Sequence, residues 1–287
     1  MKGVILAGGS GTRLRPITSV VCKQLLPVYD KPMIYYPLST LIHAGVTEIA
    51  VVSSPEEVEN FRKLLGTGRQ WGISIQYLVQ PKPEGLPQGI TLAEDFIGND
   101  SFWFILGDNL FHGPNFGPAL KTIISENGQS ANIFAYRVQN SSPYGVVDFR
   151  DGTDEIIGIT EKPKGEMPGW AIPGLYFFPN CAVRMSRSLE PSSRGELEIA
   201  DLLEAFYENS NLSVMKVSRG NAWFDLGTAE NLLTGSNFVH AIQSRQGLLI
   251  GSPEEATFHS GNIDSQTFAG LVENQYENSY FETLRNQ

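Results

Sequence analysis

Apolar and polar positions follow one another in blocks along the first half of the chain, and the blocks alternate between two spacings. Short apolar runs predict buried strands, and apolar residues that recur every three or four positions predict helices. Strands that alternate with helices predict a mainly parallel sheet with helices on both faces. The predicted elements are strand 4–7, helix 33–44, strand 48–53, helix 55–65, strand 73–79, helix 88–97, strand 102–106 and helix 116–126.

The second half of the chain is less regular. Polar turns containing glycine and proline separate short strand-like segments, and Thr228 is suited to cap the first turn of a long final helix. Beyond Gly247 the pattern weakens. One continuous domain with a C-terminal tail is the simplest interpretation. The predicted elements are strands 131–138, 144–149, 156–161, 170–177 and 212–217 and helices 183–189, 198–209 and 229–246.

Composition and charge narrow the range of partners. The 287 residues are 41% hydrophobic and 18% charged, which is ordinary for a globular protein. The net charge of −10 argues against a nucleic acid or an anionic membrane as the main partner, so local cations or a metal ion must attract an anionic substrate. Two widely separated cysteines, Cys22 and Cys181, and an N-terminus unlike a signal peptide lead us to expect a cytoplasmic protein.

The loop after the first strand carries the strongest chemical signal. Its sequence is Gly8-Gly9-Ser10-Gly11-Thr12-Arg13, and glycines followed by a cation are typical of a phosphate site, because the backbone N–H groups can turn toward an anion. It is not a dinucleotide fingerprint, since Leu14 replaces the third glycine, and it is not a Walker A loop. Taken alone, it is also compatible with a tight turn that binds nothing.

The order of elements brings other charged residues to this loop. Ligands of parallel sheets bind outside the carboxyl ends of the strands. The glycine loop and Asp108, which follows strand 102–106, both fall at that edge, so we expect Arg13, Lys23 and Asp108 in one crevice. Without the motif, a surface position is the favoured interpretation of Arg13, Lys23 is compatible with a solvated lysine, and a turn cap is the less favoured alternative for Asp108.

Several ordered motifs extend the signal along the chain. The glycine loop continues as Lys23-Gln24-Leu25-Leu26-Pro27-Val28, and further motifs lie at 29–38, 106–109, 161–163, 174–177, 194–199 and 223–228. Over roughly the first 255 residues this set resembles the sugar-phosphate nucleotidyltransferase family, in particular its branch that acts on glucose 1-phosphate and dTTP.

The resemblance implies an α/β, Rossmann-like nucleotidyltransferase fold. Residues 1–235 would form the nucleotidyltransferase domain, with a nucleotide-binding part over about 1–128 and a sugar-binding part over about 129–235; residues 236–287 would form a C-terminal helical segment used for oligomerisation. It also implies in-line transfer of a thymidylyl group from dTTP to glucose 1-phosphate with Mg²⁺ as cofactor, giving dTDP-glucose and pyrophosphate. A homotetramer and feedback by a dTDP-sugar would follow from the same resemblance.

Site residues carry over from the family position by position. The catalytic set would be Arg13, Lys23, Asp108 and Lys162, with Asp108 and Asp225 as metal ligands. The nucleotide would contact Leu6, Gly8, Gly9, Gly11, Thr12, Arg13, Gln24, Gln80, Gly85 and Asp108. The sugar phosphate would contact Tyr144, Gly145, Glu161, Lys162, Ile172 and Arg194, and a regulatory site would include Arg219, Gly220 and Glu255.

Departures from the family pattern keep alternatives open. Pro87 and Gly89 replace two alanines beside the base site, and Leu226 replaces the usual threonine after the metal aspartate. Gln80 would pair with the imide edge that thymine and uracil share, so UTP, or another hexose 1-phosphate such as an amino sugar, is an alternative substrate. A non-catalytic regulator that binds nucleotide sugars is a third hypothesis, and it predicts erosion of charged residues that are all present here.

Overall fold

The computed structural model describes residues 1–9, 11–126, 130–273, 275 and 277–286. Its strands are β1 (Lys2–Leu6), β2 (Pro27–Val28), β3 (Lys31–Pro32), β4 (Glu48–Ser53), β5 (Ser74–Val79), β6 (Phe102–Leu106), β7 (Asn109–His112), β8 (Ala131–Val138), β9 (Gly145–Phe149), β10 (Ile156–Glu161), β11 (Gly169–Ala171), β12 (Leu175–Phe178), β13 (Leu212–Lys216) and β14 (Ala222–Asp225). Its helices are α1 (Tyr35–His43), α2 (Val58–Leu65), α3 (Leu86–Leu92), α4 (Glu94–Ile97), α5 (Phe116–Glu126), α6 (Cys181–Arg187), α7 (Ile199–Glu208), α8 (Ala229–Gln246), α9 (Pro253–His259), α10 (Ser265–Glu273) and α11 (Ser279–Arg285).

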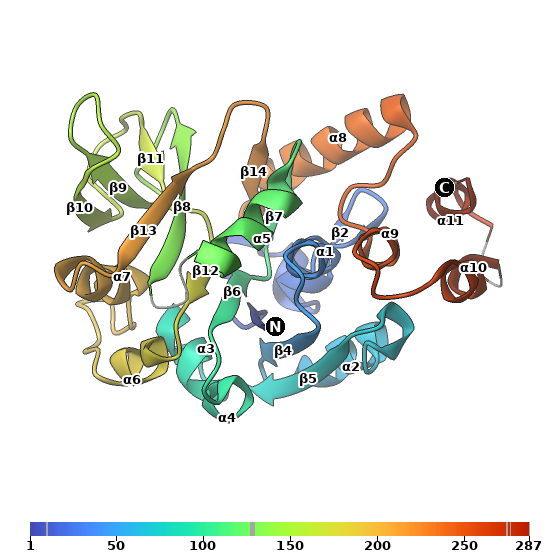
Figure 1. Ribbon diagram of the computed structural model, residues 1–287, viewed down its shortest axis with the longest axis horizontal. Helices are drawn as coiled ribbons and strands as arrows, with labels where there is room; N and C mark the ends of the chain where they lie inside the picture. The colour runs from blue at the N-terminus through green and yellow to red at the C-terminus, as the bar shows by residue number, and fades with distance from the viewer. Residues whose placement is uncertain (10, 127–129, 274, 276, 287) are drawn as a thin grey trace.

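A large sheet forms the centre of the molecule (Figure 1), in the order β10-β9-β11-β8-β12-β6-β1-β4-β5, with β13 paired to β8. β6, β1, β4 and β5 are parallel, as the alternation of strands and helices predicts. β12 lies antiparallel to both β6 and β8, and β11, β9 and β10 continue antiparallel beyond it. The sheet is therefore parallel in its N-terminal half and extended by mostly antiparallel strands in the other.

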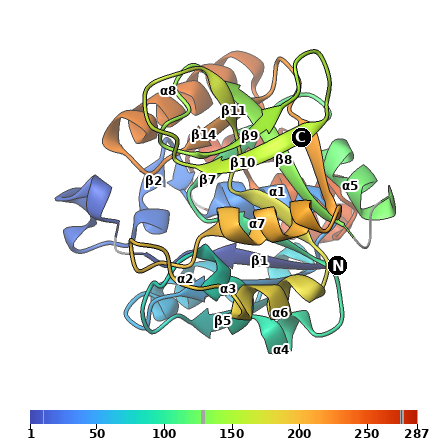
Figure 2. The ribbon, with the colours of Figure 1, turned by 90° about the vertical axis from the view of Figure 1, so that its left-hand side faces the viewer.

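Helices cover both faces of this sheet (Figure 2). Successive residues of a strand point to opposite faces, and β1 divides accordingly. Ile5 packs in a cluster with residues of α1, α2 and α5, whereas Val4 and Leu6 pack in a second cluster with residues of α3, α4, α6 and α7. Both clusters are buried, which explains why the strand is a continuous apolar run.

Two predicted elements are each divided in the structure. Helix 88–97 consists of α3 and α4, which meet at Ala93, whose φ and ψ of −91° and 8° depart from helical values. Strand 170–177 consists of β11 and β12, separated by residues 172–174, where Pro173 lacks the N–H needed for a sheet hydrogen bond. The short strands β7 and β14 were not predicted at all, because four residues are too few to show a period.

The C-terminal segment is helical, as expected. Thr228 caps α8 by accepting a hydrogen bond from the Asn231 backbone N–H at 3.2 Å. Residues of α8 share a third buried cluster with β7 and the β2–β3 hairpin, and α9, α10 and α11 follow at the end of the molecule away from β9 and β10 (Figure 1). The expected boundary at residue 235 lies inside α8, and the one near 128 falls on residues outside those described, as does Ser10 of the glycine loop. The domain division therefore stays a prediction.

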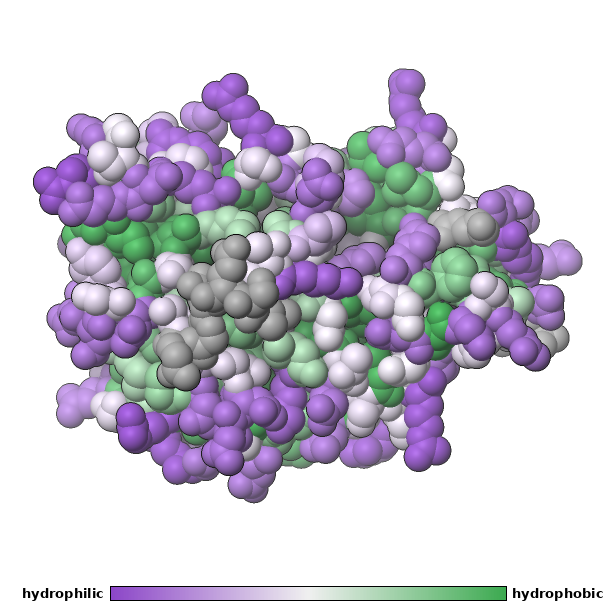
Figure 3. Space-filling view, viewed as in Figure 1, coloured by the Kyte–Doolittle hydropathy of each residue, from purple (hydrophilic) through white to green (hydrophobic). Residues whose placement is uncertain are grey.

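The outer surface mixes polar and apolar side chains. On the face shown in Figure 3, polar residues cover most of the area and apolar residues appear between them in small areas. In the described part of the chain, no helix combines the length and apolar character needed to cross a membrane.

Candidate active site

A cavity of about 490 Å³ opens at the carboxyl edge of the parallel strands and extends between them and the antiparallel extension. Most of the residues singled out from the sequence line it. They are Leu6, Gly8, Gly9, Arg13, Lys23, Gln24, Gln80, Gly85, Asp108, Tyr144, Gly145, Glu161, Lys162, Ile172, Arg194 and Asp225. Gly11 and Thr12 lie outside this lining: Gly11 adopts a left-handed conformation before a short turn, and Thr12 is exposed within that turn.

The parallel strands β1 and β6 place the first charged residues. Leu6 and Leu106 are register partners at the ends of these strands, and the Gly107 N–H donates to the Leu6 carbonyl at 2.9 Å. Asp108 therefore emerges beside the glycine loop, as the order of elements predicts. Lys23 reaches it with a 2.5 Å contact between Nζ and Asp108 Oδ2.

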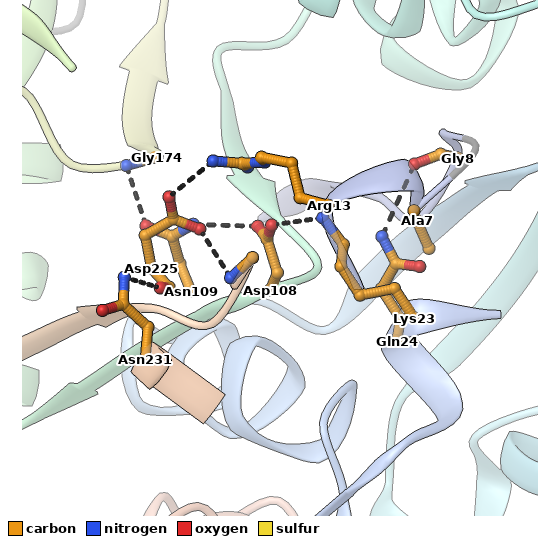
Figure 4. A network of polar contacts seen from close by, with 12 residues as sticks. Ala7, Gly8, Arg13, Lys23, Gln24, Asp108, Asn109, Gly174, Asp225 and Asn231 are labelled. Carbon is orange, nitrogen blue, oxygen red and sulfur yellow. Dashed lines mark hydrogen bonds and ion pairs between the residues drawn. The ribbon is translucent and has the colours of Figure 1, made fainter. Parts of the chain in front are cut away.

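Asp225 is positioned by strands outside the large sheet. β7 and β14 form a two-stranded antiparallel ribbon in which Asp225 is the register partner of Asn109. Asp225 Oδ1 accepts a hydrogen bond from the Gly227 N–H at 3.0 Å, and Arg13 lies 3.9 Å from Oδ2 (Figure 4). The ribbon explains how a carboxylate so distant in sequence comes to lie beside Asp108.

Asn109, which the sequence interpretation did not select, contacts Asp108 directly. Its side chain is buried and donates to Asp108 Oδ1 at 3.0 Å (Figure 4). Its Oδ1 accepts from Trp223 Nε1 at 2.6 Å and from the Gly174 N–H at 3.0 Å. Asn109 thus fixes the orientation of Asp108 and ties it to both β14 and the turn before β12. The signal was its position directly after Asp108.

The two aspartates have opposite pKa shifts. Burial, followed by the negative charge of Asp108, raises the pKa of Asp225 to about 6. Burial acts in the same direction on Asp108, but the charge and hydrogen bond of Lys23, with smaller contributions from Asn109 and Arg13, hold the pKa of Asp108 below its usual value. The site therefore contains one carboxylate that is matched by a lysine and one whose charge is poorly compensated.

Gln80 and its neighbours form the wall of the cavity next to the glycine loop. Gln80 is buried, and its Nε2 donates to Gln88 Oε1 at 2.6 Å. A Cβ added to Gly8 would lie 2.0 Å from Gln80 Oε1, so only glycine permits this approach. Gln24 supports the same loop from beneath, with Nε2 3.5 Å from the Gly8 carbonyl. Gln88, also overlooked in the sequence, fixes the amide that Gln80 presents.

The substituted positions Pro87 and Gly89 lie behind the residues that line the cavity. Pro87 and Gly89 are buried, and a Cβ on Gly89 would meet Leu6 Cδ1 at 3.0 Å and the Phe104 ring at 3.3 Å. Neither position lines the cavity. Leu226 is buried in the cluster shared with α8, which accounts for an apolar side chain there.

The other end of the cavity is built from β9, β10 and the segment before α7. Tyr144, Gly145 and Ile172 provide its floor, and Glu161 at the end of β10 is the register partner of Gly145. Lys162 Nζ lies 3.0 Å from Glu161 Oε1. Gly145, Glu161 and Ala171, next to Ile172, come together because β9 pairs with both β10 and β11.

Arg194 completes this end of the cavity. Its Nη2 lies 3.4 Å from Glu161 Oε1, and its Nε and Nη2 form a bidentate pair with Glu198. Glu198 is buried and also accepts a hydrogen bond from Ser192 Oγ at 2.6 Å. Apart from its place in the same motif, no feature of the sequence singled out Glu198.

The three residues assigned to regulation lie away from the cavity. Arg219 and Gly220 are exposed in the loop between β13 and β14, and Glu255 is half-buried in α9. Their proposed role stays a prediction.

Comparisons with known proteins agree with this geometry. Residues 2–242 match the nucleotidyl transferase family model. The chain is 47% identical over 284 residues to a glucose-1-phosphate thymidylyltransferase of Neisseria meningitidis, covering 99% of this chain and 98% of the relative. It is 46% identical to that of Mycolicibacterium smegmatis, covering 98% and 96%.

Solved structures agree as well. A crystal structure assigned as a glucose-1-phosphate thymidylyltransferase of Bacillus anthracis superimposes with a TM-score of 0.76 at 35% identity, covering 83% of this chain and 94% of that one. A UDP-glucose pyrophosphorylase complexed with UDP-glucose, at 24% identity, 84% and 98% coverage and a TM-score of 0.73, shares the fold. The chain belongs to the nucleotidyl transferase family, in the group of the glucose-1-phosphate thymidylyltransferases.

Proposed function

We propose that the chain transfers the thymidylyl group of dTTP to glucose 1-phosphate. A phosphate oxygen of glucose 1-phosphate forms a bond to the α-phosphorus of dTTP. The bond between the α-phosphorus and the oxygen that links it to the β-phosphorus breaks, and this oxygen leaves with pyrophosphate. The products are dTDP-glucose and pyrophosphate. The observation that carries the proposal is a single cavity in which the complete charged set of the family is present: Arg13, Lys23, Asp108, Lys162, Arg194 and Asp225.

The main task of the protein is to bring two polyanions together. Arg13 and the glycine loop would neutralise the triphosphate, and Lys23 would share its charge between Asp108 and the phosphates. Gln80 and Gly85 would contact the base, and Glu161 would accept hydrogen bonds from sugar hydroxyls while Lys162 and Arg194 bind the sugar phosphate. Positioning and charge stabilisation of this kind need no covalent intermediate.

Asp108 and Asp225 fit a divalent cation. Asp225 lies beside a second carboxylate, and its pKa is raised first by burial and then by the negative charge of Asp108, which Arg13 and Lys23 offset only in part. Within the described residues no cluster of three or more Asp, Glu, His or Cys could hold a metal ion, and Mg²⁺ typically binds through one or two carboxylates together with substrate phosphates. Mg²⁺ bound there would neutralise charge that develops on the phosphates.

UTP is the second candidate for the nucleotide. The Gln80 amide in the cavity lining favours UTP as a candidate substrate, because an amide pairs equally with the imide edges of thymine and uracil. Another hexose 1-phosphate, such as an amino sugar, is the corresponding alternative at the other end of the cavity.

The test is pyrophosphate release from dTTP, UTP, CTP, ATP and GTP, each paired with several sugar 1-phosphates, with Mg²⁺ and with EDTA. A maximum for dTTP with glucose 1-phosphate that EDTA abolishes is expected. A maximum at another pair would keep the mechanism and change the substrates. No release from folded protein that still binds nucleotide sugars would support a regulatory protein instead.

The family resemblance supports two further proposals. The chain would assemble as a homotetramer, and a dTDP-sugar would inhibit it at a site that includes Arg219, Gly220 and Glu255. Sedimentation analysis and inhibition by dTDP-sugars in Arg219→Ala test them separately from catalysis.

A further inference from the structure

One carboxylate oxygen contacts both cations at the sugar-phosphate end of the cavity. Lys162 Nζ and Arg194 Nη2 lie 3.0 Å and 3.4 Å from the same atom, Glu161 Oε1. These are the two cations to which we assign the phosphate of glucose 1-phosphate. An anionic oxygen held by both of them lies where a phosphate oxygen would bind.

The backbone at Lys162 makes this arrangement possible. Neighbouring residues of a strand point to opposite faces, so Glu161 and Lys162 would normally diverge. Lys162 instead has a φ of 46°, a left-handed conformation that non-glycine residues seldom adopt, and its N–H donates to the Tyr144 carbonyl at 3.0 Å. Strain of this kind concentrates at functional sites, and here it brings the lysine to the same side as the glutamate.

Arg194 has two carboxylate partners of unequal strength. Glu198 holds it through two hydrogen bonds, Nε to Oε1 at 3.0 Å and Nη2 to Oε2 at 2.6 Å, and is buried. Glu161 holds it through one longer contact and is more exposed. A bidentate, buried pair is the stronger of the two. Glu161 is therefore the partner that can leave while Glu198 keeps the guanidinium in place.

The second oxygen of Glu161 lies beside Gly145, which also lines the cavity. A Cβ on Gly145 would lie 3.2 Å from Glu161 Oε2, so the absence of a side chain there keeps this oxygen approachable. The same carboxylate thus contacts the two cations on one side and presents an acceptor to a hydroxyl on the other.

We propose that Glu161 competes with phosphate for Lys162 and Arg194, and that a sugar hydroxyl relieves this competition by drawing the carboxylate away. The inference rests on the proposed function, because it assumes that this end of the cavity binds a sugar phosphate. Inorganic phosphate has to displace the carboxylate without help, whereas a hexose phosphate supplies the hydroxyl that releases it. Glu161 would in this way make the site selective for sugar phosphates over simple phosphates.

The test compares the Kd values of inorganic phosphate and glucose 1-phosphate by calorimetry in EDTA, for the parent and for Glu161→Gln. Removing the competing charge should tighten phosphate binding about five- to tenfold, the effect expected when a carboxylate no longer pairs with two partly exposed cations. Glucose 1-phosphate should bind no more tightly than to the parent, since its hydroxyl then meets a neutral amide oxygen, a weaker acceptor than a carboxylate. The Kd of inorganic phosphate divided by the Kd of glucose 1-phosphate should therefore fall at least about fivefold.

Glu196→Gln is the matched control. Glu196 is exposed in the same segment and its charge acts on Arg194 from a distance. It should change phosphate affinity by less than about twofold. Adding Lys162→Ala to Glu161→Gln should cancel the gain in phosphate affinity. That result would show that the more tightly bound phosphate lies at Lys162 and Arg194.

Unchanged or weaker phosphate binding in Glu161→Gln, or an equal gain in Glu196→Gln, would overturn the proposal. Glu161→Asp, whose shorter side chain retracts from both cations, serves if Glu161→Gln does not melt as the parent does, and a gain of at least about twofold is then required. A parent protein that fails to bind glucose 1-phosphate would instead contradict the proposed function.

Discussion

The two ends of the cavity hold similar charges in different surroundings. Around Asp108 three of the four charged side chains are largely shielded, with Lys23 15% exposed, Asp108 9% and Asp225 15%, whereas Arg13 is 56% exposed. Around Glu161 both cations reach water: Lys162 is 45% exposed and Arg194 41%. Asp108 follows a buried strand, whereas Glu161 ends a strand and Lys162 and Arg194 lie in loops.

This difference in burial indicates that the two ends of the cavity have different tasks, a division of labour. A buried charge without its partner is strongly destabilising, so the contacts around Asp108 hold one arrangement. Exposed ion pairs contribute about 0–1 kcal/mol and exchange readily. The shielded end is thus suited to charge stabilisation during transfer, and the exposed end to exchanging its own carboxylate for a substrate phosphate.

The largest expected effect is loss of turnover at the shielded end. Asp108→Asn and Asp225→Asn should each lower kcat at least about 100-fold, because each removes a charge that would hold the metal ion. Pyrophosphate release measures this, and Asp151→Asn, in an exposed turn, is the control. Activity within a few-fold of the parent would rule out a metal site made by these two carboxylates.

Asp225→Asn should at the same time stabilise the metal-free protein. A pKa raised from 3.8 to about 6 means that the ionised form is penalised in the folded state, fully above pH 6 and not at all below pH 3.8. Replacement by a neutral amide should therefore raise the free energy of unfolding at pH 7.5 by up to about 3 kcal/mol, with a smaller gain at pH 5. Denaturant unfolding in EDTA at the two pH values measures this. A gain that grows as the pH falls would contradict the assigned sign.

At the exposed end, Lys162→Ala should act mainly on substrate affinity. The KM for glucose 1-phosphate should rise about tenfold or more with loss of a charged donor, while the KM for dTTP changes little. Lys164→Ala, an exposed lysine two residues on, is the control. An unchanged KM for glucose 1-phosphate would remove Lys162 from the phosphate site.

The smallest effect is expected beside the base site. Gly89→Ala and Pro87→Ala restore residues usual in the family, yet both positions are buried and neither lines the cavity. The ratio of kcat/KM for dTTP to that for UTP should change less than about twofold, because a side chain that does not touch the base contributes little to its selection. A larger change would show that Pro87 and Gly89 influence the choice between dTTP and UTP.

The sequence predicted the two ends unequally, for physical reasons. Asp108 and the glycine loop follow apolar strands, and the rule that ligands bind at the carboxyl edge of parallel strands places them together without any relative. Glu161, Lys162 and Arg194 lie on antiparallel strands and loops, where no such rule applies, so only family resemblance selected them. The β7–β14 ribbon, Asn109, Gln88 and Glu198 were missed because pairing between distant short segments and side-chain partners leaves no periodic signal.

The most direct test of the division of labour is binding of Mn²⁺, a paramagnetic substitute for Mg²⁺, measured by electron paramagnetic resonance in the presence of dTTP. The parent and Lys162→Ala should bind the ion with similar affinity, whereas Asp225→Asn should bind it at least about tenfold more weakly. Equal Mn²⁺ binding in Asp225→Asn and the parent would contradict the assignment of the buried carboxylate pair to the metal and, with it, the contrast between the two ends of the cavity.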